Sequence, residues 1–167
     1  DPRLILLDEK ATHQVYYRTD THWNERGAFL VYQAILEHLA ENYPLLQPWG
    51  EEQFSLQQKT LRGDLSHLFL IDPPLFETAE TWQPRQSTPA QFLSNQPKDW
   101  VVSEVQDKAL PRVVVFRDSF ANPLIPYLSN HFSRAVYISS YLAIPHLVDW
   151  EIIEQEEADV VILEIAE

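Results

Sequence analysis

The chain has 167 residues, of which 45% are hydrophobic, and this length and composition predict a single globular domain with a real core. Its formal net charge of −13 argues against nucleic acid or an anionic membrane surface as the main partner, because polyanions are repelled at long range. The chain contains no cysteine, which excludes a disulfide framework, and no apolar run near the roughly 18 residues of a membrane span. Because it has no methionine and opens on Asp1-Pro2, we expect a fragment of a longer protein, with any targeting sequence left outside.

The N-terminal part of the chain predicts two short strands and one long helix. The strands are expected at residues 3–7 and 14–17, where short apolar or aromatic runs are bounded by polar residues. The helix should begin after Asn24, a residue type that caps helix N-termini, and continue through an apolar series to about Asn42. It should stop before Tyr43-Pro44, because the residue ahead of a proline avoids the α region.

Residues 45–109 show weaker periodicity, and their prolines interrupt any long element. We therefore expect an irregular, loop-rich insertion over about 45–109. Within it, residues 61–66 predict a turn that leads into a short helix, and residues 100–105 predict a strand. The insertion could be a surface excursion with incidental aromatic residues, or a lid or binding wall over a compact core, and the sequence leaves both open.

After Pro111 the pattern becomes regular. Strands are predicted at residues 112–116, 135–139 and 160–165, and helices at residues 123–130 and 145–155. Strands that alternate with helices indicate parallel βαβ units with right-handed crossovers, and hence an α/β fold with a mostly parallel sheet. In such sheets ligands bind beyond the carboxyl ends of the strands.

Two blocks far apart in the sequence carry candidate catalytic residues. Asp20 and His22 are two residues apart, a spacing that turns both side chains to the same side of an extended backbone. Ser119 follows the strand predicted at 112–116 and precedes a helix, the kind of turn on which nucleophilic serines are displayed. A nucleophile, a base and a carboxylate that orients the base together make up a Ser-His-Asp triad.

Each of these residues also has a structural interpretation. A serine after Asp118 at a strand end can be an N-cap, and Asp118 itself can fix the turn through backbone hydrogen bonds. Asp20 and His22 could belong to a hydrogen-bonded turn, or to a metal site with His13 or His67 as a further ligand. The joint occurrence of the two blocks favours the triad, and we expect no metal ion and no cofactor.

Four stretches of the chain, namely residues 17–24, Gly27-Ala28, residues 63–65 and residues 117–120, resemble the SGNH hydrolase-like domains of the alginate O-acetyltransferase (AlgX/AlgJ-like) family. The resemblance covers most of the chain. In that family an Asp-x-His pair precedes the Asp-Ser block, the reverse of ordinary SGNH esterases, and this chain has the reversed order. The resemblance therefore implies a three-layer α/β/α SGNH hydrolase-like fold with a mostly parallel central sheet and a circularly permuted chain order.

The resemblance also implies a function. It assigns Ser119 as the nucleophile, His22 as the general base and Asp20 as the orienting carboxylate of an enzyme that moves acetyl groups to hydroxyls of an extracytoplasmic polysaccharide. The acetyl donor would be delivered by a membrane-bound acyltransferase partner, and the site of action would be the periplasm or the outer face of the cytoplasmic membrane. Two alternatives stay open: an acetyl esterase of glycans, and a non-catalytic carbohydrate-binding module on the same scaffold.

The residues that would support this site are less well defined by the sequence. Ordinary SGNH enzymes have a glycine where Arg117 stands in this chain. Gly63 could supply a backbone N–H, and Asn122 a side-chain amide, to the oxyanion. Trp23 could wall the site and Tyr141 could stack on a sugar ring, although ordinary packing is the other interpretation for both. From the net charge we expect a neutral or weakly charged glycan rather than a polyanion such as alginate.

Overall fold

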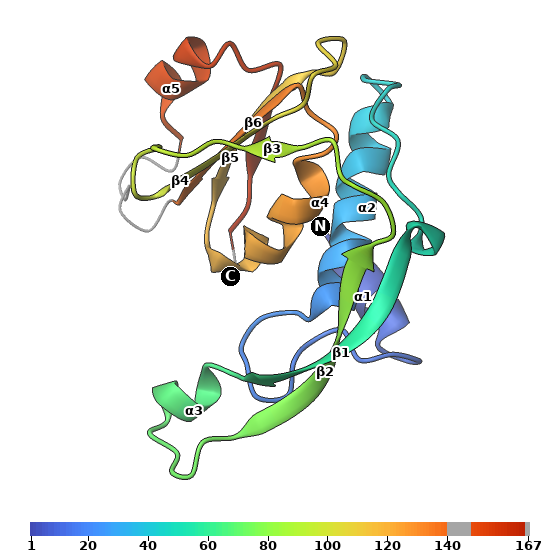
Figure 1. The fold of residues 1–167 in the computed structure, drawn as a ribbon, viewed down its shortest axis with the longest axis vertical. Coiled ribbons are helices and arrows are strands. Elements are labelled where there is room, and N and C mark those ends of the chain that lie inside the picture. Colours follow the sequence, from blue (N-terminus) through green and yellow to red (C-terminus); the bar gives the residue numbers. More distant parts are fainter. Residues whose placement is uncertain (140–147, 166–167) are drawn as a thin grey trace. The chain divides into compact units, whose positions relative to one another are not determined.

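The computed structural model describes residues 1–139 and 148–165 (Figure 1). The chain divides into two compact units. The first unit consists of Asp1–Ile35 and Pro48–Ser87, and the second of Leu36–Gln47 and Thr88–Glu167. The expectation of a single domain over residues 1–167 stays a prediction. No helix in the described part of the chain is both long and apolar enough to cross a membrane.

The first unit contains helices and a long β-hairpin. Its helical elements are α1 (Arg3–Glu9), the larger part of α2 (Glu25–Ala40), the 3₁₀ helix η1 (Glu51–Gln53) and α3 (Leu65–Leu68). The hairpin pairs β1 (Phe54–Arg62) with β2 (Phe76–Pro84) in antiparallel register along their whole lengths. Figure 1 shows α3 in the connection between the two strands.

An aromatic cluster forms the core of the first unit. The Phe29 ring from α2 lies 4.5 Å from the Trp82 ring and 5.4 Å from the Phe54 ring, centroid to centroid, and all three side chains are buried. The helix that carries Phe29 is the one predicted from the sequence. Its N-terminus is capped as expected, since Asn24 Oδ1 accepts a hydrogen bond from the Gly27 N–H at 3.0 Å, and it ends at Ala40.

The second unit is built on a five-stranded sheet of order β3-β4-β6-β5-β7. Its strands are β3 (Gln91–Phe92), β4 (Trp100–Glu104), β5 (Arg112–Arg117), β6 (Arg134–Ser139) and β7 (Val160–Leu163). β5 is parallel to both β6 and β7, whereas β4 runs antiparallel to β6 and to β3. The fold class is α/β as predicted, with a mixed sheet whose parallel part is the βαβ region read from the sequence.

Helical segments connect the parallel strands of the second unit. They are the 3₁₀ helix η2 (Ser119–Leu124), α4 (Ile125–Leu128) and α5 (Trp150–Gln155). One face of the sheet buries Val114, Phe116 and Val136, and Ile152 and Ile153 of α5 pack against that cluster. The β-branched run of β5 is buried on both faces, which explains why it lacks polar alternation.

Two predictions for the N-terminal part were wrong. Residues 3–7 form the helix α1 rather than a strand, because a short apolar run carries no periodicity that tells the two apart, and only Leu6 of this helix is buried. Residues 14–17 form no strand beyond an isolated bridge between Tyr16 and Trp23. That bridge closes a loop rather than extending a sheet.

The expectation of an irregular insertion at 45–109 was also wrong for residues 54–84, which form the hairpin. Most residues of β1 and β2 are exposed or half-buried, so few apolar residues are needed in either strand. Their sequences therefore do not alternate strictly between apolar and polar residues, the pattern that predicts a half-buried strand. The short helix after residues 61–64 and the strand near 100–105 are confirmed as α3 and β4.

Beyond Pro111 the predicted order of elements is confirmed with changed boundaries. The helix predicted at 123–130 begins earlier, at Ser119, and its first part is the 3₁₀ helix η2. The helix predicted at 145–155 is described from Trp150, and its beginning falls partly on residues 140–147, outside the described residues.

Candidate active site

Asp20 and His22 form a hydrogen-bonded pair in the first unit. Asp20 Oδ1 lies 2.6 Å from His22 Nδ1, and the same oxygen accepts the His22 backbone N–H at 3.0 Å. The block lies on a loop closed by a bond from the Tyr17 N–H to the His22 carbonyl. With Nδ1–H donated to the carboxylate, Nε2 is the basic nitrogen, which is the tautomer that a general base requires.

A second carboxylate, Asp64, braces this pair from another part of the chain. The Asp64 N–H donates to Asp20 Oδ2 at 3.0 Å, and Asp64 Oδ1 accepts the Thr21 N–H at 2.8 Å. Asp64 Oδ2 accepts the Thr21 hydroxyl and lies 3.8 Å from His22 Nδ1, too far for a hydrogen bond. Asp20 is therefore the direct partner of the imidazole, and Asp64 holds the loop that carries both.

Gly63 lets these two segments approach each other. A Cβ at this position would lie 1.8 Å from the Thr19 carbonyl oxygen, and the Leu65 N–H donates to that oxygen at 3.1 Å. No side chain larger than hydrogen fits without moving the backbone. The structure thus gives Gly63 a packing role beside the Asp20 loop, while its role as an oxyanion donor stays a prediction.

The local hydrogen bonds favour the ionised form of Asp20. Burial alone would raise its pKa, but bonds from the His22 N–H, the His22 ring and the Asp64 N–H outweigh burial and lower the pKa below 3.8. Asp20 is consequently a carboxylate at neutral pH. An ionised carboxylate is what the proposed orienting role needs, because it can stabilise an imidazolium as it forms.

Asp20, His22 and Asp64 also form the kind of group that could hold a metal ion, since one ligand atom from each lies within 4.8 Å of the others. Their hydrogen-bond distances and the Thr21 donors to Asp64 fit a proton-linked network at this site. His13, one of the two further ligands that the sequence offered, lies 2.8 Å from Glu9. His67 is exposed on α3, and within residues 1–139 and 148–165 neither histidine joins the group.

Ser119 lies in the second unit, directly after the carboxyl end of β5. Asp118 caps the following 3₁₀ helix, since its Oδ1 accepts the Phe120 N–H at 2.8 Å. Ser119 is the first residue of that helix and is partly exposed. The predicted strand-to-helix turn is confirmed, and the structure gives the capping role to Asp118 rather than to Ser119.

Arg117, the residue that stands where ordinary SGNH enzymes have glycine, is buried at 8% exposure. Its Nη1 donates to Asn122 Oδ1 at 2.6 Å and to the Asp118 carbonyl at 3.2 Å. The guanidinium therefore ties the end of β5 to the helical turn that follows Ser119. Because the Asn122 oxygen is engaged in this way, only the NH₂ group of that amide remains for the oxyanion role predicted from the sequence.

Glu164 is a residue of this region that sequence reasoning missed. It follows β7, and its Oε2 accepts the Asp118 N–H at 3.1 Å. Burial and the nearby Asp118 charge raise the pKa of Glu164 to about 7. The only signal in the sequence was the place of Glu164 at the end of a strand that could pair with β5, and pairing order is not readable from one sequence.

The remaining predicted residues have less to do with the site. Trp23 is buried at 5% exposure, so its ring offers little surface to a sugar and suits a core position. Tyr141 lies outside the described residues. The structure brings together Asp20, His22 and Asp64 in one unit and Arg117, Asp118, Ser119 and Asn122 in the other. The pairing of His22 with Ser119 stays a prediction.

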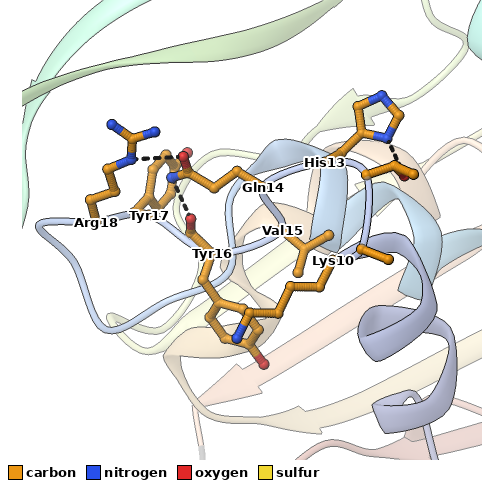
Figure 2. A pocket seen from close by; sticks show the side chains of 9 residues that line it. Lys10, His13, Gln14, Val15, Tyr16, Tyr17 and Arg18 are labelled. Carbon is orange, nitrogen blue, oxygen red and sulfur yellow. Dashed lines mark hydrogen bonds between the residues drawn. The ribbon is translucent and has the colours of Figure 1, made fainter.

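A pocket of about 460 Å³ lies in the first unit along the segment that leads to Asp20 (Figure 2). It is lined by residues 10–18, which include Lys10 and two tyrosines. Gln14 organises its polar side: its amide donates to the Tyr16 carbonyl at 2.6 Å and accepts from Arg18 Nε at 3.0 Å. Aromatic side chains with a few convergent polar groups are the usual lining of a ligand pocket.

Comparisons with known proteins agree with this description. A family model described as ALGX, the SGNH hydrolase-like domain of acetyltransferase AlgX, matches residues 2–144. No protein of curated function matches the sequence.

Solved structures that share the fold include three from different bacteria. PatB1 of Bacillus cereus has a TM-score of 0.68 at 17% identity, over 95% of this chain and 67% of that chain. A DHHW family protein from Eubacterium siraeum has a TM-score of 0.68 at 16% identity, over 96% and 61%. The O-acetyltransferase domain of Pseudomonas putida AlgJ has a TM-score of 0.55 at 20% identity, over 99% and 57%. The chain thus spans only about three fifths of the latter two structures.

Proposed function

Because the chain belongs to the family of SGNH hydrolase-like acetyltransferase domains of the AlgX type, we propose that it transfers acetyl groups to polysaccharide hydroxyls through an acetyl-serine at Ser119. The observation that carries the proposal is the 2.6 Å distance between Asp20 Oδ1 and His22 Nδ1, because an Nδ1–H donated to the carboxylate leaves Nε2 as the nitrogen of a general base. The place of Ser119, on a capped turn after a parallel strand, supports the assignment of the nucleophile.

The proposed reaction has two steps. In the first, His22 takes the Ser119 proton as the serine oxygen attacks the acetyl carbonyl, and the tetrahedral oxyanion is held by backbone N–H groups near Ser119. The intermediate collapses to acetyl-serine, and the leaving group of the donor departs with the proton from His22. In the second step, a glycan hydroxyl gives its proton to His22 as its oxygen attacks the acetyl-serine carbonyl. The serine ester bond then breaks, the glycan keeps the acetyl group, and His22 returns the proton to the Ser119 oxygen.

The acceptor and its setting are part of the same proposal. An extracytoplasmic polysaccharide would bind along the first unit, at the pocket lined by residues 10–18, the segment that precedes Asp20 in the chain. A membrane-bound acyltransferase partner would deliver the acetyl group, in the periplasm or at the outer face of the cytoplasmic membrane. The match to the AlgX-type acetyltransferase family supports acetyl transfer as the reaction, and the setting follows from the family resemblance of the sequence.

Covalent trapping of Ser119 tests the proposal. The protein is incubated with 4-nitrophenyl acetate, quenched in acid and mapped by peptide mass spectrometry, and we expect the acetyl group on the peptide that contains Ser119. Ser119→Ala should abolish both the label and ester turnover. Ser87→Ala, at an exposed serine far along the chain, is the matched control and should keep both. Full turnover by Ser119→Ala would refute the proposed nucleophile.

Adding an acceptor separates transfer from hydrolysis. With neutral oligosaccharides present, a transferase should release less acetate and yield acetylated sugar. Acetate release that the oligosaccharide does not change would assign the chain as an esterase. Sugar binding without any acetylation of Ser119 would assign it as a binding module.

A further inference from the structure

Glu164 stands at the end of β7, beside the turn that carries Ser119. β7 pairs with β5 in parallel, with Leu163 opposite Phe116. The ladder continues one step further, because the Glu164 N–H donates to the Phe116 carbonyl at 2.9 Å. This bond fixes the backbone of Glu164 at the point where the neighbouring chain leaves β5 and turns into η2.

From this position the Glu164 carboxyl group accepts backbone N–H groups on both sides of Ser119. Its Oε2 accepts the Asp118 N–H at 3.1 Å, and the Ala121 N–H also donates to the same carboxyl group. Asp118 takes the Phe120 N–H at 2.8 Å. The first N–H groups of a helix have no intrahelical partner, so acceptors from outside decide where its first turn lies.

We propose that Glu164 is a positioning residue for Ser119, whose carboxyl group holds the backbone before and after the serine and thereby sets the place of its hydroxyl. The inference rests on the proposed function of Ser119. A residue that only capped the helix would affect stability alone. A positioning residue also affects the reaction rate, because a shift of the turn by about 1 Å can lower the rate on the order of 10²-fold without unfolding the protein.

The charges around Glu164 give the proposal a pH signature. Burial and the Asp118 carboxylate raise the pKa of Glu164 to about 7, and the charged groups on the facing turn are Asp118 and Arg117. Because this pKa lies above the ordinary value of 4.5, the stability that Glu164 contributes is complete at low pH and falls as pH rises through about 7. Ionisation of Glu164 strengthens its two N–H bonds but places a buried charge beside the Asp118 carboxylate. Because the pKa is raised, the second effect is the larger, and the turn should be held less firmly as pH rises over the same range.

The test uses Glu164→Ala, Glu164→Gln and, as a matched control, Glu154→Gln on the exposed side of α5. Amide hydrogen exchange of residues 117–122 and the rate of Ser119 labelling by phenylmethanesulfonyl fluoride are measured, with the melting temperature as a check on folding. Glu164→Ala should speed exchange at Asp118 and Ala121 and slow labelling roughly tenfold to 100-fold. Glu164→Gln keeps a neutral acceptor, so its labelling rate relative to the parent should rise with pH through about 7.

The proposal is overturned if Glu164→Ala shows the same amide exchange rates and the same Ser119 labelling rate as the parent. If that variant fails to fold, Glu164→Gln decides: a labelling ratio that stays flat across neutral pH also overturns it. Loss of the proposed function gives a different pattern. Ester turnover would then survive Ser119→Ala, whereas the exchange data would still report whether Glu164 holds the turn.

Discussion

Asp20 accepts three hydrogen bonds at once, two from His22 and one from the Asp64 backbone. These three hydrogen bonds explain why the pKa of Asp20 is lowered despite partial burial. The bond to Nδ1 also gives the His22 ring one defined orientation. The spacing of Asp20 and His22 predicted that they would meet. The contacts that Asp64 and Gly63 make with the Asp20 loop could not be predicted from the sequence. The two segments are more than forty positions apart in the chain, and they meet because the hairpin connection begins beside that loop.

Asp20→Asn should lower acetyl-ester turnover by about 10⁴, by analogy with the same change in serine proteases, because the amide favours the wrong histidine tautomer. The measurement is kcat on 4-nitrophenyl acetate, alongside Asp64→Asn as the matched control. Asp64 lies 3.8 Å from the ring nitrogen and bonds Thr21 instead, so its loss should be below about tenfold. The reverse order of effects would make Asp64 the true partner.

At the scale of elements, the sequence predicted what local pattern determines and missed what tertiary pairing determines. α2 has a capping asparagine and a helical apolar series, and β5 has a β-branched run buried on both faces, so both were predicted correctly. The hairpin was missed because its strands are held by backbone pairing and by two buried aromatic residues at one end, Phe54 and Trp82. Glu164 was missed for the same reason, since its role follows from the pairing of β7 with β5.

One side chain of the hairpin anchors the loop that carries Asp20 and His22. Glu77 on β2 accepts the Arg18 N–H at 3.0 Å, the Thr19 N–H at 2.8 Å and the Thr19 hydroxyl at 2.7 Å. Burial opposes ionisation, but these bonds outweigh it and lower the pKa of Glu77 below 4.5. A carboxyl group whose pKa is lowered by folding stabilises the protein fully at pH values above its ordinary pKa. That stability is lost as pH falls through the lowered pKa, so this anchor should weaken in acid.

Thermal melting between pH 7 and pH 3 should reveal the anchor. The parent should lose more melting temperature below about pH 4.5 than Glu77→Gln does, because the variant has no carboxylate to protonate. Glu80→Gln, at an exposed position of the same strand, is the control and should follow the parent. Parallel curves for the parent and Glu77→Gln would show that the carboxylate does not anchor the loop.

Over the whole molecule, the net charge of −13 sets the field that an acceptor meets. We expect neutral oligosaccharides to bind more tightly than uronate oligosaccharides at low salt, because long-range repulsion opposes the anionic series and added salt screens it. Titrating both series at low and high ionic strength measures the effect. Tighter binding of the uronates at low salt would mean that basic groups such as Lys10 and Arg18 at the pocket override the global charge.

The two compact units are interleaved along the chain, since Leu36–Gln47 of the second unit interrupts the first and Pro48–Ser87 of the first interrupts the second. No single cut therefore separates the histidine unit from the serine unit. A truncated gene that keeps residues 88–167 loses Leu36 and Leu46, two completely buried side chains of the second unit. Because the four segments alternate between the units, circular permutation would leave them alternating, and expressing the two units as separate chains would require moving the 36–47 segment to join residues 88–167.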